Sequence, residues 1–116
     1  MSIERHEVGP RMSKAVVHGN SVYLSGITPN AARGQSMGEQ TKDVLAQIDG
    51  FLKQAGTDKS KLISANIWIT DMTKFAEMNA VWDAWVSPGN TPARATVEAK
   101  LAAPDYLVEI MVVAAK

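Results

Sequence analysis

The last strand-like segment of the chain, Tyr106 to Ala114, is apolar on both of its sides. Successive side chains of a strand point to opposite faces of a sheet. Here one face carries Leu107, Met111 and Val113, and the other carries Val108, Ile110 and Val112. An antiparallel sheet with one face in water alternates apolar and polar residues instead. The segment therefore predicts a sheet that is covered on both faces.

Two segments have helical periodicity, about residues 36–55 and 73–86. Ser36 and Glu39 have the spacing of a capping box at the start of the first, and its apolar stripe ends before Gly56.

The second helix carries aromatic residues that we interpret as core, with Asn79 on or beside the same stripe. A buried amide needs hydrogen-bond partners, so Asn79 either ties down a loop or contacts a ligand. Asp71 or Thr73 can cap this helix, and the run Ser87-Pro88-Gly89 ends it.

Five segments are predicted to be strands. They are two runs within Ala15–Gly26, then Leu62–Thr70, Arg94–Lys100 and Tyr106–Ala114. Gly19-Asn20 between the first two suits a type II′ hairpin turn. Alternation in the third places Ile63 on its apolar face. The last two would form a hairpin that turns near residues 101–105.

Two helices are enough to cover one face of a sheet of about five strands, as in two-layer α+β domains. Another copy of the chain is the simplest cover for the second face, because closed homo-oligomers are common and large exposed apolar patches are rare. The sequence thus predicts one α+β domain over residues 1–116, with a mainly antiparallel sheet, in an obligate oligomer. Clefts between subunits are common small-molecule sites.

The charged and metal-binding residues narrow the possible functions. Twelve Lys and Arg balance twelve Asp and Glu, so the sequence has no evident excess of positive charge that would attract nucleic acid or an acidic membrane. There is no Cys, and two distant His do not suggest zinc. The first residues, MSIERHEVGPR, lack a secretory apolar core, and no span approaches about 18 apolar residues. We expect a cytoplasmic protein with no metal or organic cofactor.

Arg94 and Glu109 are charged residues in otherwise strand-like surroundings. Glu109 shares a face with Leu107 and Met111, and an unpaired carboxylate there costs several kcal/mol. A hairpin would bring Arg94 near it, and either an Arg94–Glu109 or an Arg94–Glu98 ion pair would have a purely structural role. Alternatively, an arginine at a strand mouth suits bidentate capture of a small carboxylate, with Glu109 activating water.

Three stretches resemble the RidA/YjgF family of reactive intermediate deaminases: SGI at Ser25–Ile27, ANIWITDMTKFAEMNAVWDAW, and PARATVEAKLAAPDYLVEI. The resemblance covers nearly the whole chain. Its most specific part is the P-A-R block with a glutamate fifteen residues after the arginine. It implies a chorismate-mutase-like subunit in a homotrimer, with three sites in the clefts between subunits.

The resemblance also implies an activity, the hydrolysis of enamine and imine acids such as 2-aminoacrylate, 2-iminopropanoate and 2-iminobutanoate to 2-oxo acids and ammonia. By position in the family motifs, Arg94 would hold the substrate carboxylate and Glu109 would orient or activate water. Asn79 and the backbone of Gly26 would line the pocket. Thr96 stands where the family often has Cys or Ser, and its hydroxyl would make a polar contact.

The chain departs from the family pattern near its amino terminus. Met12 stands where many family deaminases place a pocket tyrosine, and the run GPRMSKAV also introduces Lys14. Arg94 is therefore expected to hold an acid of different size or polarity. Two further hypotheses stay open: a non-catalytic trimer that binds a small carboxylate, and a ribonuclease or translation inhibitor, which the neutral charge disfavours.

Overall fold

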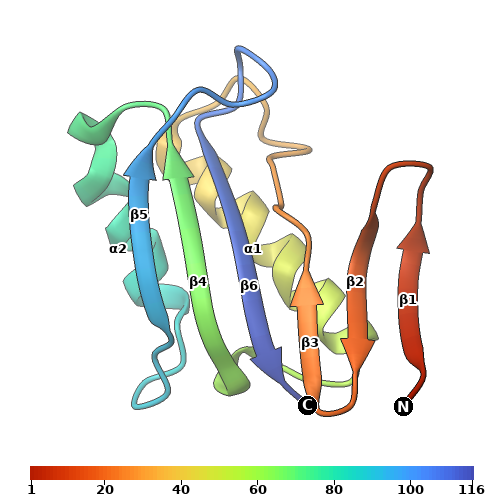
Figure 1. Cartoon of the computed structure of the whole chain (residues 1–116). Coiled ribbons are helices and arrows are strands. Elements are labelled where there is room, and N and C mark those ends of the chain that lie inside the picture. Colours follow the sequence, from red (N-terminus) through yellow and green to blue (C-terminus); the bar gives the residue numbers. More distant parts are fainter.

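One sheet of six strands, in the order β1-β2-β3-β6-β4-β5, forms the first layer of the computed structural model, which describes residues 1–116 (Figure 1). Its strands are β1 Ile3–Val8, β2 Ser13–His18, β3 Ser21–Leu24, β4 Leu62–Ile69, β5 Ala93–Glu98 and β6 Val108–Ala115. All neighbouring strands are antiparallel except β4 and β5, which run parallel.

The helices α1, Met37–Gln54, and α2, Phe75–Trp85, form the second layer. Figure 1 shows both behind the sheet, with no element over the face turned toward the viewer, which we call the open face. The predicted two-layer α+β architecture is thus confirmed. No helix has the length and apolar character needed to cross a membrane.

The hydrophobic core lies between the helices and the sheet. β6 contributes four residues that are fully buried there, Val108, Ile110, Val112 and Ala114. The intervening residues of β6 point to the open face and are half-buried in the single chain, namely Glu109, Met111, Val113 and Ala115. The prediction that β6 is apolar on both faces is therefore confirmed, and the open face still carries exposed apolar groups such as Tyr23 and Val97.

Local sequence signals explain the ends of the elements. The Ser36 side chain accepts the Glu39 backbone N–H at the start of α1, and Gly56 just beyond its end has φ +86°. Gly19 alone has positive φ in the β2–β3 turn, as a type II′ turn requires. Asp71 caps a short 3₁₀ turn, Met72–Lys74, that leads into α2.

Two details of the sheet differ from the sequence-based prediction. β1 was not expected: its burial pattern shows five exposed residues of six, so it has no apolar periodicity to detect. The prediction that Ile63 lies on the buried face is wrong. A bulge between Leu62 and Ser64 shifts the register there, so Leu62 is buried and Ile63 is 51% exposed.

The predicted hairpin of the last two strands is also wrong. β4 lies between β5 and β6, so each pairs with β4 and not with the other. A chain leaving β5 must therefore cross the end of β4 before it enters β6, and residues 99–107 make that connection.

Candidate functional site

Arg94 lies near the start of β5, at the edge of the sheet. It pairs with buried Ala65 of β4 and so points to the helix side. Its Nη1 donates a hydrogen bond to Asn79 Oδ1 of α2 over 2.8 Å, and the guanidinium carbon lies 5.5 Å from the ring centre of Trp82. This is the only hydrogen bond of the Arg94 side chain. Arg94 is thus held in place by α2 while most of its donors stay free.

Thr96 lies two residues further along β5, on the same side of the sheet as Arg94. Its Oγ1 is buried and has no hydrogen-bond partner within the subunit. This hydroxyl is therefore available for a hydrogen bond with a group from outside the subunit. Arg94, Asn79 and Thr96 form the group that we call the arginine half-site.

Glu109 lies on β6, opposite Trp68 of β4, and points to the open face. Its carboxylate makes no ion pair or side-chain hydrogen bond within the subunit and lies against Gly26. A Cβ at Gly26 would overlap Oε2 of Glu109 and lie 3.0 Å from its Cδ. A larger residue at position 26 would therefore displace this carboxylate from its observed position. We call Gly26 and Glu109 the glutamate half-site.

The two half-sites do not face each other within one chain. Ala65 pairs with both Arg94 and Val112, so Arg94 shares the helix side with buried Val112. Glu109 is three residues from Val112 and must point to the opposite face. The strands β5 and β6 are also about 10 Å apart, with β4 between them.

Neither of the ion pairs considered for Arg94 forms. Arg94 is bound by Asn79, and the carboxylate of Glu98 instead accepts the backbone N–H of Met72 over 2.8 Å. Asn79 therefore ties Arg94 rather than a loop. A purely structural Arg94–Glu109 or Arg94–Glu98 pair is excluded within the subunit.

Met12 lies in the turn between β1 and β2 and is 51% exposed. It lines a pocket of about 240 Å³ together with Glu7, Gly9, Pro10, Arg11 and Lys14. Lys14 is half-buried in β2, and its carbonyl accepts the N–H of Ser25, the residue before Gly26. Lys14 thus lies next to the glutamate half-site rather than the arginine half-site, and Met12 shares its pocket.

Comparison with known proteins decides the family. The family model described as Endoribonuclease L-PSP matches residues 4–116. A RutC family protein of Haemophilus influenzae is 42% identical over 114 residues, covering 98% of each chain, and the RutC family protein YoaB of Escherichia coli is 44% identical over 115 residues, covering 99% of each. The crystal structure of NMB1025 from Neisseria meningitidis, a YjgF family protein, is 48% identical, with a TM-score of 0.97 over 100% of this chain and 96% of that one.

The chain belongs to the RidA/YjgF family. The resemblance drawn from its motifs is thereby confirmed over the whole length, and so is the fold that the resemblance implied. The names of these YjgF relatives state a family and no substrate.

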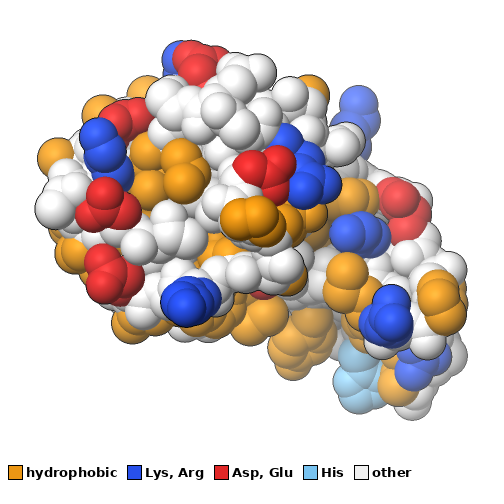
Figure 2. Space-filling model, turned by 90° about the horizontal axis from the view of Figure 1, so that it is seen from above, with side chains coloured by type: hydrophobic (Ala, Val, Ile, Leu, Met, Phe, Trp, Pro, Cys, Tyr) orange, Lys and Arg blue, Asp and Glu red, His pale blue; other side chains and the backbone are white.

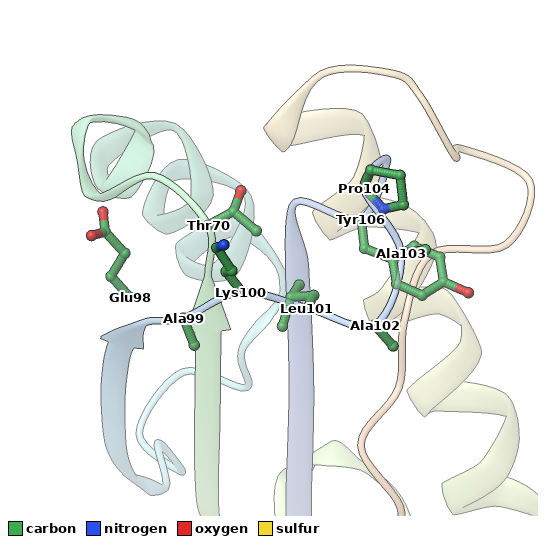
Figure 3. Close-up of a pocket in the computed structure, with 9 residues that line it drawn as sticks. All are labelled: Thr70, Glu98, Ala99, Lys100, Leu101, Ala102, Ala103, Pro104 and Tyr106. Carbon is green, nitrogen blue, oxygen red and sulfur yellow. The ribbon is translucent and has the colours of Figure 1, made fainter.

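The connection from β5 to β6 in this YjgF family chain leads directly into the strand that carries Glu109. Figure 3 shows it running from the end of β5 past the ends of β4 and β6. Its residues line most of a cavity of about 670 Å³. The fully buried side chain of Gln40 donates to the Asp105 carbonyl over 2.9 Å and accepts the Leu107 N–H over 2.7 Å. The segment just before β6 is therefore fixed to α1.

Arg33 fixes the same connection from outside. Its guanidinium donates two hydrogen bonds to the Asp105 carboxylate, of 2.9 and 2.8 Å, and lies 4.7 Å from the ring centre of Tyr106. These bonds hold the pKa of Asp105 below its ordinary value and raise that of Arg33. No local pattern in the sequence points to these roles of Gln40 and Arg33, because their partners in the connection are 65 to 72 residues away.

Proposed function

We propose that the protein is a deaminase that hydrolyses reactive enamine and imine acids to 2-oxo acids and ammonia. The observation that carries this proposal is the pair of half-sites with complementary chemistry. One offers a braced guanidinium with free donors for a carboxylate, and the other offers an unpaired carboxylate beside a glycine. Neither is complete alone.

A second copy of the chain is proposed to join the half-sites. The open face of the sheet carries half-buried Met111 and Val113 and exposed Tyr23 and Val97, which a neighbouring subunit would cover. We propose a homotrimer in which the arginine half-site of one subunit meets the glutamate half-site of the next. Each of the three clefts would then hold one Arg94 and one Glu109.

The proposed reaction uses only these side chains and water. Arg94 binds the substrate carboxylate through two N–H donors, and Thr96 Oγ1 offers a further polar contact. Glu109 holds a water molecule and takes its proton as the oxygen attacks the imine carbon. Glu109 returns that proton to the nitrogen, which gives the neutral carbinolamine. It then transfers the carbinolamine hydroxyl proton to the same nitrogen as the C–N bond breaks, and the products are ammonia and the 2-oxo acid. An enamine substrate first gains a proton at carbon to become the imine.

The required acceleration is modest. Imino acids already hydrolyse in water. Orienting the substrate and positioning one water molecule are therefore sufficient to accelerate the reaction. No step calls for a metal or an organic cofactor.

A carboxylate-binding protein without turnover is the second candidate, because the arginine half-site alone can hold an organic acid. Ribonuclease action, which the description of the family model names, has less support. The formal charge is zero, and Figure 2 shows acidic and basic side chains interspersed over the face seen from above.

The decisive experiment measures 2-oxo acid formation while a serine or threonine dehydratase generates the imine in situ. We expect the wild type to accelerate hydrolysis and Arg94→Ala to abolish the acceleration while the oligomer persists. Lys53→Ala, a change of an exposed cation in the last turn of α1 and away from the open face, serves as the control and should retain the rate. An inactive wild type that still binds 2-oxo acids would favour the binding protein.

A further inference from the structure

We propose that Lys14 receives a second acidic group of the substrate, so that the preferred substrates are imines of dicarboxylic amino acids. This inference rests on the proposed function and on the same cleft. Lys14, Met12 and the pocket between them would bind the part of the substrate that lies farthest from Arg94.

The strand register places Lys14 on the same face as Glu109. Val16 pairs with Tyr23, which pairs with Val113, and all three point to the open face. Lys14 is two residues before Val16, and Glu109 is four residues before Val113, so both side chains point to that face as well.

The segment Ser25–Gly26 links the two residues in space. The Lys14 carbonyl accepts the Ser25 N–H over 3.0 Å, and the Glu109 carboxylate lies against Gly26, the next residue. The side chain of Lys14 has a flexible four-carbon stem that can turn its ammonium toward a substrate held at Glu109. A substrate with a second acidic group would extend from Glu109 toward this ammonium.

Lys14 is a half-buried cation that forms no ion pair. The subunit has three side-chain ion pairs, and none of them includes Lys14. Glu7 of β1 stands across from Lys14, between the pairs His6–Ala15 and Val8–Ser13, and is the one acid in the lining of the same pocket. Arg11 also lines that pocket, so its cations outnumber its acid, and a substrate carboxylate would supply the second anion.

The pocket beside Lys14 has the lining that such a substrate needs. Its walls include the apolar side chains of Pro10 and Met12, suited to methylene groups, and its charges are Arg11 and Lys14 against the single Glu7. Figure 2 shows several basic side chains at the narrow end of the molecule, among hydrophobic, acidic and histidine side chains. The excess positive charge favours an anionic group over a neutral one.

The test compares two imines with the same number of carbons, 2-iminosuccinate and 2-iminobutanoate, generated in situ from aspartate and 2-aminobutanoate by amino-acid oxidases. For each, kcat/KM is measured on the full-length oligomer as formation of the 2-oxo acid. We expect the wild type to prefer the dicarboxylate. In Lys14→Met, the ratio of the two kcat/KM values should fall about tenfold, the size of one charge-assisted hydrogen bond. Lys53→Met, at an exposed lysine in the last turn of α1, should leave the ratio unchanged.

Binding is measured in parallel by titration with succinate and with butyrate, so that the role of Lys14 is tested without turnover. Weaker succinate binding in Lys14→Met, with a smaller effect on butyrate, is expected. If the wild type hydrolyses both imines but prefers the monocarboxylate, or if Lys14→Met keeps the wild-type ratio, the inference is overturned and the deaminase proposal stands. If neither imine is hydrolysed faster, the deaminase proposal fails, and equal succinate affinity in wild type and Lys14→Met then also removes the role of Lys14.

Discussion

Arg94 Nη1 donates to Asn79 Oδ1 over 2.8 Å and so joins the edge strand β5 to helix α2. An amide oxygen orients the guanidinium without neutralising it, which leaves the positive charge available for a carboxylate. Asn79 is therefore a residue that positions Arg94, and the first prediction concerns the replacement of its neutral amide.

Replacing Asn79 should weaken substrate binding in a graded way. Asn79→Ala frees the Arg94 side chain and should raise KM about tenfold. Asn79→Asp should raise KM further, because the new carboxylate competes with the substrate for the guanidinium. The readout is KM for the imine together with the Kd of a 2-oxo acid. Asp83→Ala on the exposed side of α2 is the control, and equal KM values for Asn79→Ala and Asn79→Asp would contradict the argument.

Gly26 gives a second prediction, on catalysis rather than binding. A methyl group at Gly26 would overlap the Glu109 carboxylate, so Gly26→Ala should displace it and lower kcat at least about tenfold. The matched control is Gly50→Ala in α1, where a Cβ meets nothing within 4 Å. That change should raise stability by about 0.5–1 kcal/mol and keep kcat. A fully active Gly26→Ala would show that Glu109 does not act from its observed position.

The sequence predicts those parts of the fold that depend on residues close together along the chain. Ser36 with Glu39 marks the start of α1 because an N-cap acts over three residues, and β6 is recognisable because its alternation is continuous. Gly19 marks its turn for the same reason.

The errors arose where distant segments decide the outcome. The residues of β5 and β6 contain no signal that β4 lies between these strands. The prediction of a β5–β6 hairpin, and of an Arg94–Glu109 ion pair across it, is therefore wrong. The bulge that turns Ile63 outward depends on the register with β6. The family motif predicts that Arg94 and Glu109 act in one site, but the sheet places them on opposite faces of the subunit, so a site that contains both would need a second copy of the chain.

Gln40 carries a third prediction, on stability. Its fully buried amide satisfies the Asp105 carbonyl and the Leu107 N–H. Gln40→Met keeps the volume but leaves these buried groups without partners, so the free energy of unfolding should fall by about 2–3 kcal/mol. Urea unfolding measures the change. Gln54→Met, at an exposed glutamine, should change it by less than about 0.5 kcal/mol, and a similar loss in both variants would refute the role of Gln40.

The Arg33–Asp105 pair gives a fourth prediction, on pH. Hydrogen bonds from Arg33 lower the pKa of Asp105 in the folded state. A carboxyl group of this kind stabilises the fold above its unfolded pKa, about 3.9, and loses that contribution as the pH falls through the folded pKa. Asp105→Asn lacks this contribution. Its urea midpoint should therefore be lower than that of the wild type at pH 6, and the difference should shrink below about pH 4. A difference that is constant from pH 6 to about pH 2.5 would contradict the linkage.

The last prediction tests whether one site takes residues from two chains. Arg94→Ala and Glu109→Gln should each be inactive, because each destroys one half-site in every subunit. When the two variants are unfolded together and refolded as mixed oligomers, some clefts receive Arg94 from one variant and Glu109 from the other. In a closed ring mixed at random, about one quarter of the clefts are then intact, whatever the number of subunits. Activity should return to about a quarter of the wild-type rate, and each variant refolded alone should stay inactive. If both residues acted from the same chain, no mixture could contain an intact site and the activity would not return, so the mixing experiment separates the two arrangements directly.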